Sequence, residues 1–97
     1  MEGIRTAAPG REIITMVIFK QGNKILTKIQ KYKNRYYIFI PTRNGNGIGA
    51  EYDLEINAIM KTHDYIKGIL SIRSNKKYTM TYIYDNGHKE KYIYYAD

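Results

Sequence analysis

The sequence predicts one mostly β domain, a small α+β fold in which antiparallel hairpins form a small sheet or barrel with one short helix. β-branched and aromatic residues, which suit strands, are abundant, and 11 of the 97 residues are tyrosines. Several segments alternate between apolar and polar residues, which is the period of a strand with one buried face. Short clusters of Gly, Asn and Lys separate these segments, as hairpin turns would.

The chain begins with a segment that shows no periodicity. Residues 1–10 contain Pro9 and two glycines, so we expect a flexible arm, followed by a single β-rich domain over residues 11–97. The segment Glu12–Lys20 carries a short, strongly β-branched apolar run. Such a run is too short for a helix and predicts a buried strand.

A hairpin is expected next. The turn Gln21–Asn23 contains Gly22, which can take a positive φ at no steric cost. Lys24–Lys31 then alternates with period two, which predicts a half-buried strand with a basic outer face. The side chains expected on its inner face are Ile25, Thr27 and Ile29.

The second hairpin would turn at Tyr32–Arg35. Asn34 suits this turn because asparagine tolerates the left-handed backbone conformation. The run Tyr36–Ile40 is apolar on both faces, so it predicts a central strand. Pro41 cannot donate to a sheet ladder, and we expect it to end this strand.

The middle of the chain predicts a loop, a strand and a helix. Thr42–Gly49 holds three glycines, each costing a helix about 1 kcal/mol, and it matches no phosphate-binding glycine motif, so it predicts a mobile loop. Tyr52–Ile56 alternates and predicts a third strand. Ala58–Lys67 has apolar residues at helical spacing, with Asn57 as its N-cap and Gly68 as its stop.

The C-terminal part predicts a tyrosine-rich hairpin. After a short strand at Ile69–Arg73, residues 78–95 alternate on both sides of Asn86 and Gly87, a pair typical of a type I′ turn. Aromatic side chains share one face across this hairpin. They include Tyr82, Tyr84, Tyr92 and Tyr94.

Charge and composition bound the partners. The chain carries 16 Lys and Arg against 9 Asp and Glu, a net charge of +7, which favours nucleic acid, an anionic membrane surface or an acidic protein. The absence of cysteine excludes disulfides and cysteine zinc sites and favours a cytoplasmic location. No apolar run approaches the length of about 20 residues of a membrane helix, and the N-terminus lacks the apolar core of a signal peptide, so we expect no membrane insertion.

The residues that usually carry catalysis are sparse. His63 and His88 stand far apart in no metal motif, and His63 with Asp64 is typical of a surface pair on a helix. Asp53 and Glu55 share a strand face in the expected third strand, which is typical of a solvated acidic edge. We therefore expect no enzyme, no cofactor and no metal.

Basic side chains concentrate around the second expected strand and the turn after it. A basic β-ribbon can lie in a nucleic-acid groove with phosphates on both sides, although lysines on a strand also serve solubility and edge protection. The expected nucleic-acid-binding residues, which Lys20 precedes, are Lys24, Lys28, Lys31, Lys33, Arg35 and Arg43.

Two other hypotheses involve the tyrosines. The C-terminal hairpin could contact a protein partner, as in an inhibitor or accessory subunit, since tyrosine is enriched at interface hot spots. The residues for that contact would be Tyr82, Tyr84, Tyr92 and Tyr94. Alternatively, tyrosines could stack on the bases of a single-stranded nucleic acid.

Three segments of residues 27–56 carry a resemblance to a known family: Lys28–Arg35, Tyr37–Pro41 and Ala50–Ile56. Together they resemble the AbrB/MazE/SpoVT swapped-hairpin DNA-binding fold. The resemblance implies a homodimer with interleaved hairpins in one barrel, gripping duplex DNA in a regulatory or architectural role. A glycine-rich link replaces the family's short Leu-rich helix, and Tyr52-Asp53 replaces its Gly-Asp. The side chains that the resemblance assigns to DNA are Lys28, Lys31, Lys33, Arg35 and Arg43.

Overall fold

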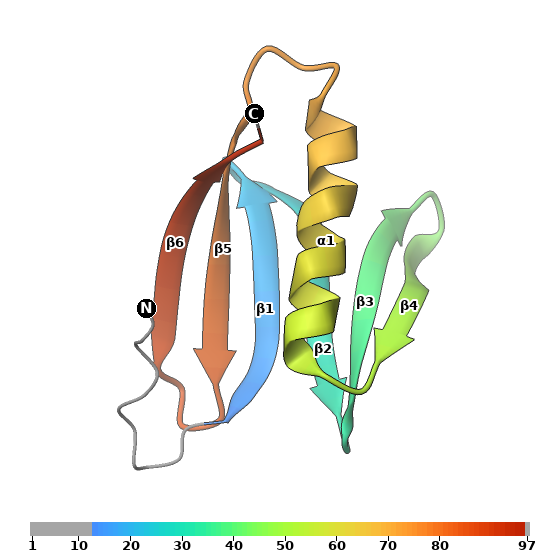
Figure 1. Cartoon of the computed structure of the whole chain (residues 1–97), viewed down its shortest axis with the longest axis vertical. Coiled ribbons are helices and arrows are strands. Elements are labelled where there is room, and N and C mark those ends of the chain that lie inside the picture. The colour runs from blue at the N-terminus through green and yellow to red at the C-terminus, as the bar shows by residue number, and fades with distance from the viewer. Residues whose placement is uncertain (1–12, 97) are drawn as a thin grey trace.

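A computed structural model describes residues 13–96 and contains six strands and one helix (Figure 1). The arm expected at residues 1–10 lies outside the described residues. In chain order the elements are β1 (Ile14–Gln21), β2 (Lys24–Tyr32), β3 (Arg35–Thr42), β4 (Gly45–Tyr52), α1 (Glu55–Leu70), β5 (Lys77–Tyr84) and β6 (Lys89–Tyr95).

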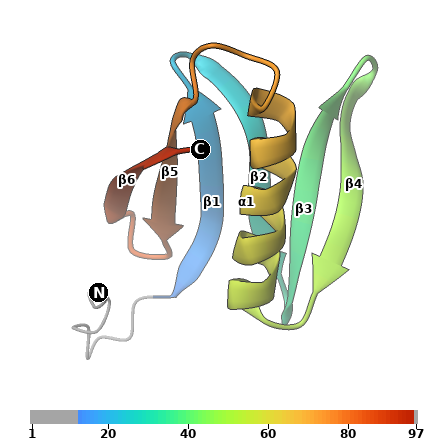
Figure 2. The same ribbon diagram turned by 45° about the horizontal axis from the view of Figure 1, so that its top comes forward.

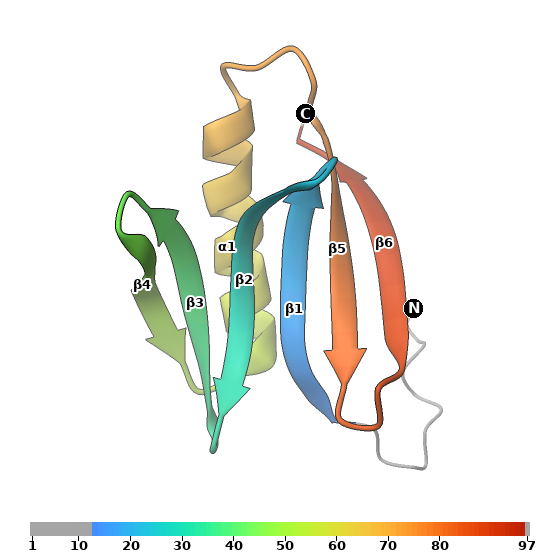
Figure 3. The same ribbon diagram turned by 180° about the vertical axis from the view of Figure 1, so that it is seen from behind.

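All six strands form one antiparallel sheet of order β4-β3-β2-β1-β5-β6. The helix α1 lies against one face of this sheet, over β2 and β3, and the other face is left open (Figures 2 and 3). The prediction of a mostly β fold with antiparallel hairpins and one helix is confirmed. The sheet is open and does not close into a barrel.

The core lies between the sheet and α1. Because side chains alternate along a strand, every second residue of each strand points toward the helix. The helix supplies a stripe at Ala58, Thr62, Ile66 and Leu70, four residues apart, as one helix face requires. The buried strand residues that meet this side of the sheet include Val17, Phe19, Ile29, Ile38, Tyr78 and Met80.

The second strand departs from strict alternation. The register shifts between Phe19 and Lys20, so that β2 carries one extra residue, Leu26, opposite β1. Leu26 is buried, whereas Ile25 is 45% exposed. The prediction that Ile25 faces inward is therefore wrong, and only Thr27 and Ile29 of the expected inner set are buried.

The glycine-rich segment forms β4 and not a mobile loop. It begins at Gly45, whose φ is 119°, and pairs along its length with β3. A Cβ on Gly49 would collide with the side chain of Ile40, so glycine lets the two strands meet closely there. Ladder hydrogen bonds to β3 offset the low strand propensity of glycine.

The third strand as expected does not exist, because its residues open the helix. Leu54 is the N-cap of α1 without a side-chain cap bond, and Ile56 in the first turn is 56% exposed. Asn57 and Gly68 lie inside the helix and do not bound it. The helix also absorbs Ile69 and Leu70, so no strand exists at Ile69–Arg73.

Proline does not end β3. Pro41 pairs with Asn46 of β4 inside the strand, which runs on to Thr42. The β2–β3 ladder already ends at Lys28 and Phe39, and the two strands then separate (Figure 3). No N–H of residue 41 is therefore needed on that side, which explains why the strand tolerates proline.

Two turns differ from expectation and one agrees. Gly22 has φ 62° as expected. In the next turn Lys33 takes the positive φ, 58°, while Asn34 does not. At the last hairpin the Gly87 N–H donates to the Tyr84 carbonyl at 3.0 Å, and Gly87 but not Asn86 has a positive φ. This is a three-residue turn with a left-handed glycine and not the expected type I′ turn.

Candidate nucleic-acid interface

The face of the sheet away from α1, the open face, carries a continuous row of side chains. The registers align one residue from each strand in the order Ile48, Phe39, Lys28, Ile18, Thr81 and Lys91. Apolar and aromatic groups lie at the β4–β3 end of this row, and polar and basic groups lie at the β5–β6 end. The two ends of the open face therefore offer different chemistry.

A shallow hollow of about 400 Å³ lies at the aromatic end of the open face. We name it the aromatic hollow. Tyr32 and Ile48 are 61% and 62% exposed there. Three rings from β2 and β3 thus present apolar surface to solvent, an arrangement more typical of a binding surface than of a monomer's outer face. The lining residues are Gln30, Tyr32, Tyr37, Phe39 and Ile48.

Two lysines lie against these rings. The Lys28 ammonium is 5.9 Å from the centroid of Phe39, and the Lys33 ammonium is 5.4 Å from the centroid of Tyr32. Both distances are within the range of cation–π attraction. A flat ring beside a positive charge can hold a base by stacking and a neighbouring phosphate by charge.

The six basic residues expected to bind nucleic acid do not converge. Lys28 alone lies on the open face, while Lys31 lies on the helix side, 6.0 Å from the Tyr36 centroid. Lys24 and Lys33 stand at opposite ends of the nine-residue β2, roughly 27 Å apart at the usual rise of a strand. Arg43 lies in the β3–β4 turn, at the far end of the hairpin from Lys33.

Arg35 is engaged with acidic groups of the same chain. Its Nη2 is 2.8 Å from Glu51 Oε2, and its Nη1 also bonds to Asp53. These carboxylates offset the charge of the arginine at the end of β3. Arg35 is thus a poorer candidate for a phosphate contact than the lysines of the open face.

The tyrosines expected to bind a protein partner lie on the helix side of the sheet. Tyr84 is only 3% exposed, and its hydroxyl donates to Glu90 at 2.8 Å. Tyr82 and Tyr92 meet edge to face with ring centroids 5.7 Å apart. Tyr94 is half-buried against the core. These rings are used in packing, whereas the exposed rings of the aromatic hollow come from β2 and β3.

Sequence reasoning missed Tyr32, Tyr37 and Phe39 as site residues. Their alternation was visible, because Tyr37 and Phe39 are two positions apart on one strand. What the sequence lacked was the position of the helix, which decides the covered face. The same gap hid the lysines of the other strands on the open face, Lys77, Lys89 and Lys91.

His63 is not a surface residue paired with Asp64, as expected. Its Nδ1 lies 2.7 Å from the Tyr78 hydroxyl, and its ring packs edge-on against Phe19 and Tyr94. Burial lowers the pKa of His63, Lys67 lowers it further, and Asp64 acts in the opposite direction. The histidine belongs to the contact between sheet and helix and has no catalytic neighbour there.

Two general findings concern residues 13–96. No group of three or more histidine, aspartate or glutamate side chains is close enough to hold a metal ion within this range. No helix of the described part combines the length and the apolarity that crossing a membrane requires.

Comparison of the chain with protein-family models gives no match, and comparisons with curated proteins and with solved structures likewise give none. The resemblance of residues 27–56 to the swapped-hairpin DNA-binding fold is neither supported nor contradicted by them, and it stays a hypothesis.

Proposed function

We propose that the protein binds single-stranded nucleic acid across the open face of its sheet. Bases stack in the aromatic hollow, and lysines of the same face contact the backbone. The observation that carries this proposal is the set of three solvent-facing rings, two of them with a lysine ammonium within 6 Å. Aromatic platforms flanked by positive charge are the common device of single-strand binders.

The spacing of the rings suits an extended strand. Tyr37 and Phe39 are two residues apart on β3, so their side chains are separated by about 6.8 Å. That is twice the rise of about 3.4 Å per nucleotide along a duplex strand. One base on each ring requires a strand whose bases are pulled apart, which a duplex cannot offer without melting.

Charge on the open face favours a polyanion. Its lysines are Lys20, Lys28, Lys77, Lys89 and Lys91. Among the described strands, Glu51 is the single acidic side chain on this face, and it pairs with Arg35. The excess of positive charge supports attraction to phosphates along the whole face.

Duplex DNA bound by the basic hairpin is the weaker alternative. Its expected contacts lie at both ends and on both sides of β2, and Arg35 is neutralised within the chain. A regulatory or architectural role in the cytoplasm is compatible with either ligand, and so is a homodimer.

The test is fluorescence anisotropy with labelled oligonucleotides, single-stranded and duplex, at fixed salt. Tyr32→Ala should weaken single-strand binding by about 1–3 kcal/mol, or roughly 5- to 150-fold, because one stacking ring is lost. Tyr65→Ala on the exposed side of α1 is the matched control and should change nothing.

Equal or tighter binding of the duplex would overturn the proposal, as would equal effects of the two variants. Sedimentation distinguishes a further outcome. If the open face instead covers a second copy of the chain, wild-type protein would sediment as a dimer and Tyr32→Ala as a monomer, and no oligonucleotide would bind.

A further inference from the structure

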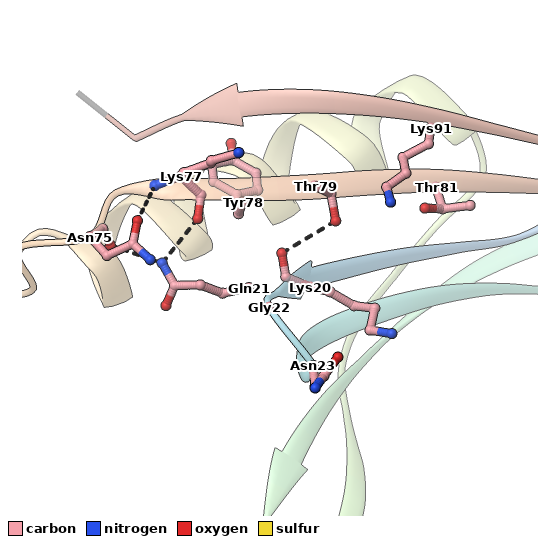
Figure 4. Close-up of a pocket in the computed structure, with 10 residues that line it drawn as sticks. All are labelled: Lys20, Gln21, Gly22, Asn23, Asn75, Lys77, Tyr78, Thr79, Thr81 and Lys91. Atoms are coloured by element: carbon pink, nitrogen blue, oxygen red, sulfur yellow. Dashed lines mark hydrogen bonds between the residues drawn. The ribbon is translucent and has the colours of Figure 1, made fainter.

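A second hollow lies on the open face at the β5–β6 end (Figure 4). Its volume is about 530 Å³, and we name it the lysine hollow. It is formed where the β1–β2 turn meets β5 and β6, so it lies on the opposite side of the sheet centre from the aromatic hollow. The side chains that give it its chemistry are Lys20, Lys77, Lys91, Thr79, Thr81 and Asn23.

One wall of the lysine hollow is fixed by hydrogen bonds. The Gln21 amide donates to the carbonyls of Asn75 and Lys77 at 2.8 and 3.0 Å (Figure 4). Its Oε1 accepts a bond of 3.3 Å from Arg73, and Asn75 Oδ1 accepts the Lys77 N–H at 3.1 Å. These bonds join the end of β1 to the segment before β5, so the hollow exists before any ligand arrives.

The chemistry of the lysine hollow suits an oxyanion. Three ammonium groups and two hydroxyls can donate hydrogen bonds into it, and none of the described residues that line it is acidic. Lys91 extends from β6 across β5 beside Thr81 (Figure 4). Thr79 donates weakly to the Lys20 carbonyl at 3.5 Å and keeps oxygen lone pairs free to accept. Lysine clusters of this kind recognise phosphate as a point charge.

The two hollows lie on one path across the sheet. The row of aligned residues leads from Phe39 through Lys28 and Ile18 to Thr81 and Lys91. From β3 to β5 there are three interstrand spacings, about 14 Å in all. At about 6.8 Å per extended nucleotide, this distance corresponds to about two nucleotides.

We propose that the lysine hollow binds a backbone phosphate of the same single strand, about two nucleotides beyond the bases held in the aromatic hollow. This assignment rests on the proposed function and adds to it a defined path and a minimum length. A dinucleotide can occupy only one hollow, whereas a strand of six or more nucleotides reaches both.

The experiment compares two double variants in oligonucleotide binding over a salt series. Lys20→Gln with Lys91→Gln should make the slope of log affinity against log salt less negative by about 1.4, because each lost phosphate contact on a single strand changes it by about 0.7. The effect should appear with hexanucleotides and longer strands and be absent with dinucleotides. Lys61→Gln with Lys67→Gln, on the exposed side of α1, should leave the slope unchanged.

A second readout uses inorganic phosphate alone, followed by amide chemical shifts. Shifts confined to residues 20–23 and 75–81, and lost in the Lys20→Gln, Lys91→Gln variant, would support the lysine hollow. Oligonucleotide binding with an unchanged salt slope and no phosphate shifts would overturn the lysine hollow and leave the proposed function intact. Phosphate shifts without any oligonucleotide binding would overturn the proposed function and keep only an anion site.

Discussion

A single buried hydroxyl holds the aromatic hollow in place. Thr27 is fully buried, and its Oγ1 donates to the Phe39 carbonyl at 2.6 Å. This bond forms beside the last rung of the β2–β3 ladder, at the point where the strands separate. It extends the connection between them by one hydrogen bond and so fixes the backbone that carries Phe39.

Thr27→Val should lower the free energy of unfolding by about 1–2 kcal/mol, because the shape is kept while the Phe39 carbonyl loses a donor. Thr62→Val is the matched control, since Thr62 is equally buried but its hydroxyl bonds only to the Ala58 carbonyl, which already accepts a helix hydrogen bond. Urea denaturation measures both. A smaller loss in Thr27→Val than in Thr62→Val would contradict this role.

At the scale of elements, α1 is closed at its C-terminus by a residue that follows it. The Lys76 ammonium donates to the carbonyls of Leu70, Ser71 and Arg73 at 3.0, 3.2 and 2.7 Å. The last carbonyls of a helix have no intrahelical donor, and the negative end of the helix dipole favours a cation. Lys76 therefore ends the helix where glycine usually does, and Gly68 stays free to lie inside it.

Lys76→Met should destabilise the fold by about 1–2 kcal/mol, because three carbonyl contacts and a favourable charge are lost while the apolar stem remains. Lys77→Met, whose side chain is exposed, should cost far less. Thermal unfolding followed by circular dichroism compares the two variants. Equal melting temperatures would show that the cap contributes nothing.

For the whole molecule, the contact between sheet and helix contains one titratable group, His63. Its neighbours are Phe19 from β1, Tyr78 from β5 and Tyr94 from β6, with Lys67 and Asp64 on its own helix. Burial, aided by Lys67, lowers the pKa of His63 below the ordinary value of 6.5. The neutral imidazole is thus the form that the folded state prefers.

The sign of the pH dependence follows from this shift. Between the lowered folded pKa and 6.5 the unfolded chain binds the proton more readily, so protonation favours unfolding. Stability from His63 is complete above pH 6.5 and should be lost as the pH falls through the folded pKa. Urea midpoints between pH 7.5 and 5 should show this fall in the wild type and in His88→Gln, but a smaller one in His63→Gln. The same slope in all three proteins would assign the effect to other groups.

Much of the fold could be predicted from local pattern. Five of the six strands coincide with runs that are β-branched or alternating, and the turn at Gly22 was recognisable from its residue type. β4 could not be predicted, because three glycines reduce strand propensity and only pairing with β3 stabilises that conformation. The start of α1 was hidden because Tyr52, Leu54 and Ile56 also fit a period of two, and Leu54 and Ile56 are exposed.

By itself, the sequence determined a mostly β chain of antiparallel hairpins with one helix and a positive charge. It did so because strand period, turn residues and charge are local properties. Only the tertiary structure decided which face of each strand is covered. Alternation divides Tyr37 and Phe39 from Ile38, and Tyr82 and Tyr84 from Ile83, but both sets of rings look alike in a sequence. The placement of α1 buries one set and leaves the other in solvent, since a helix can cover only one face of the sheet.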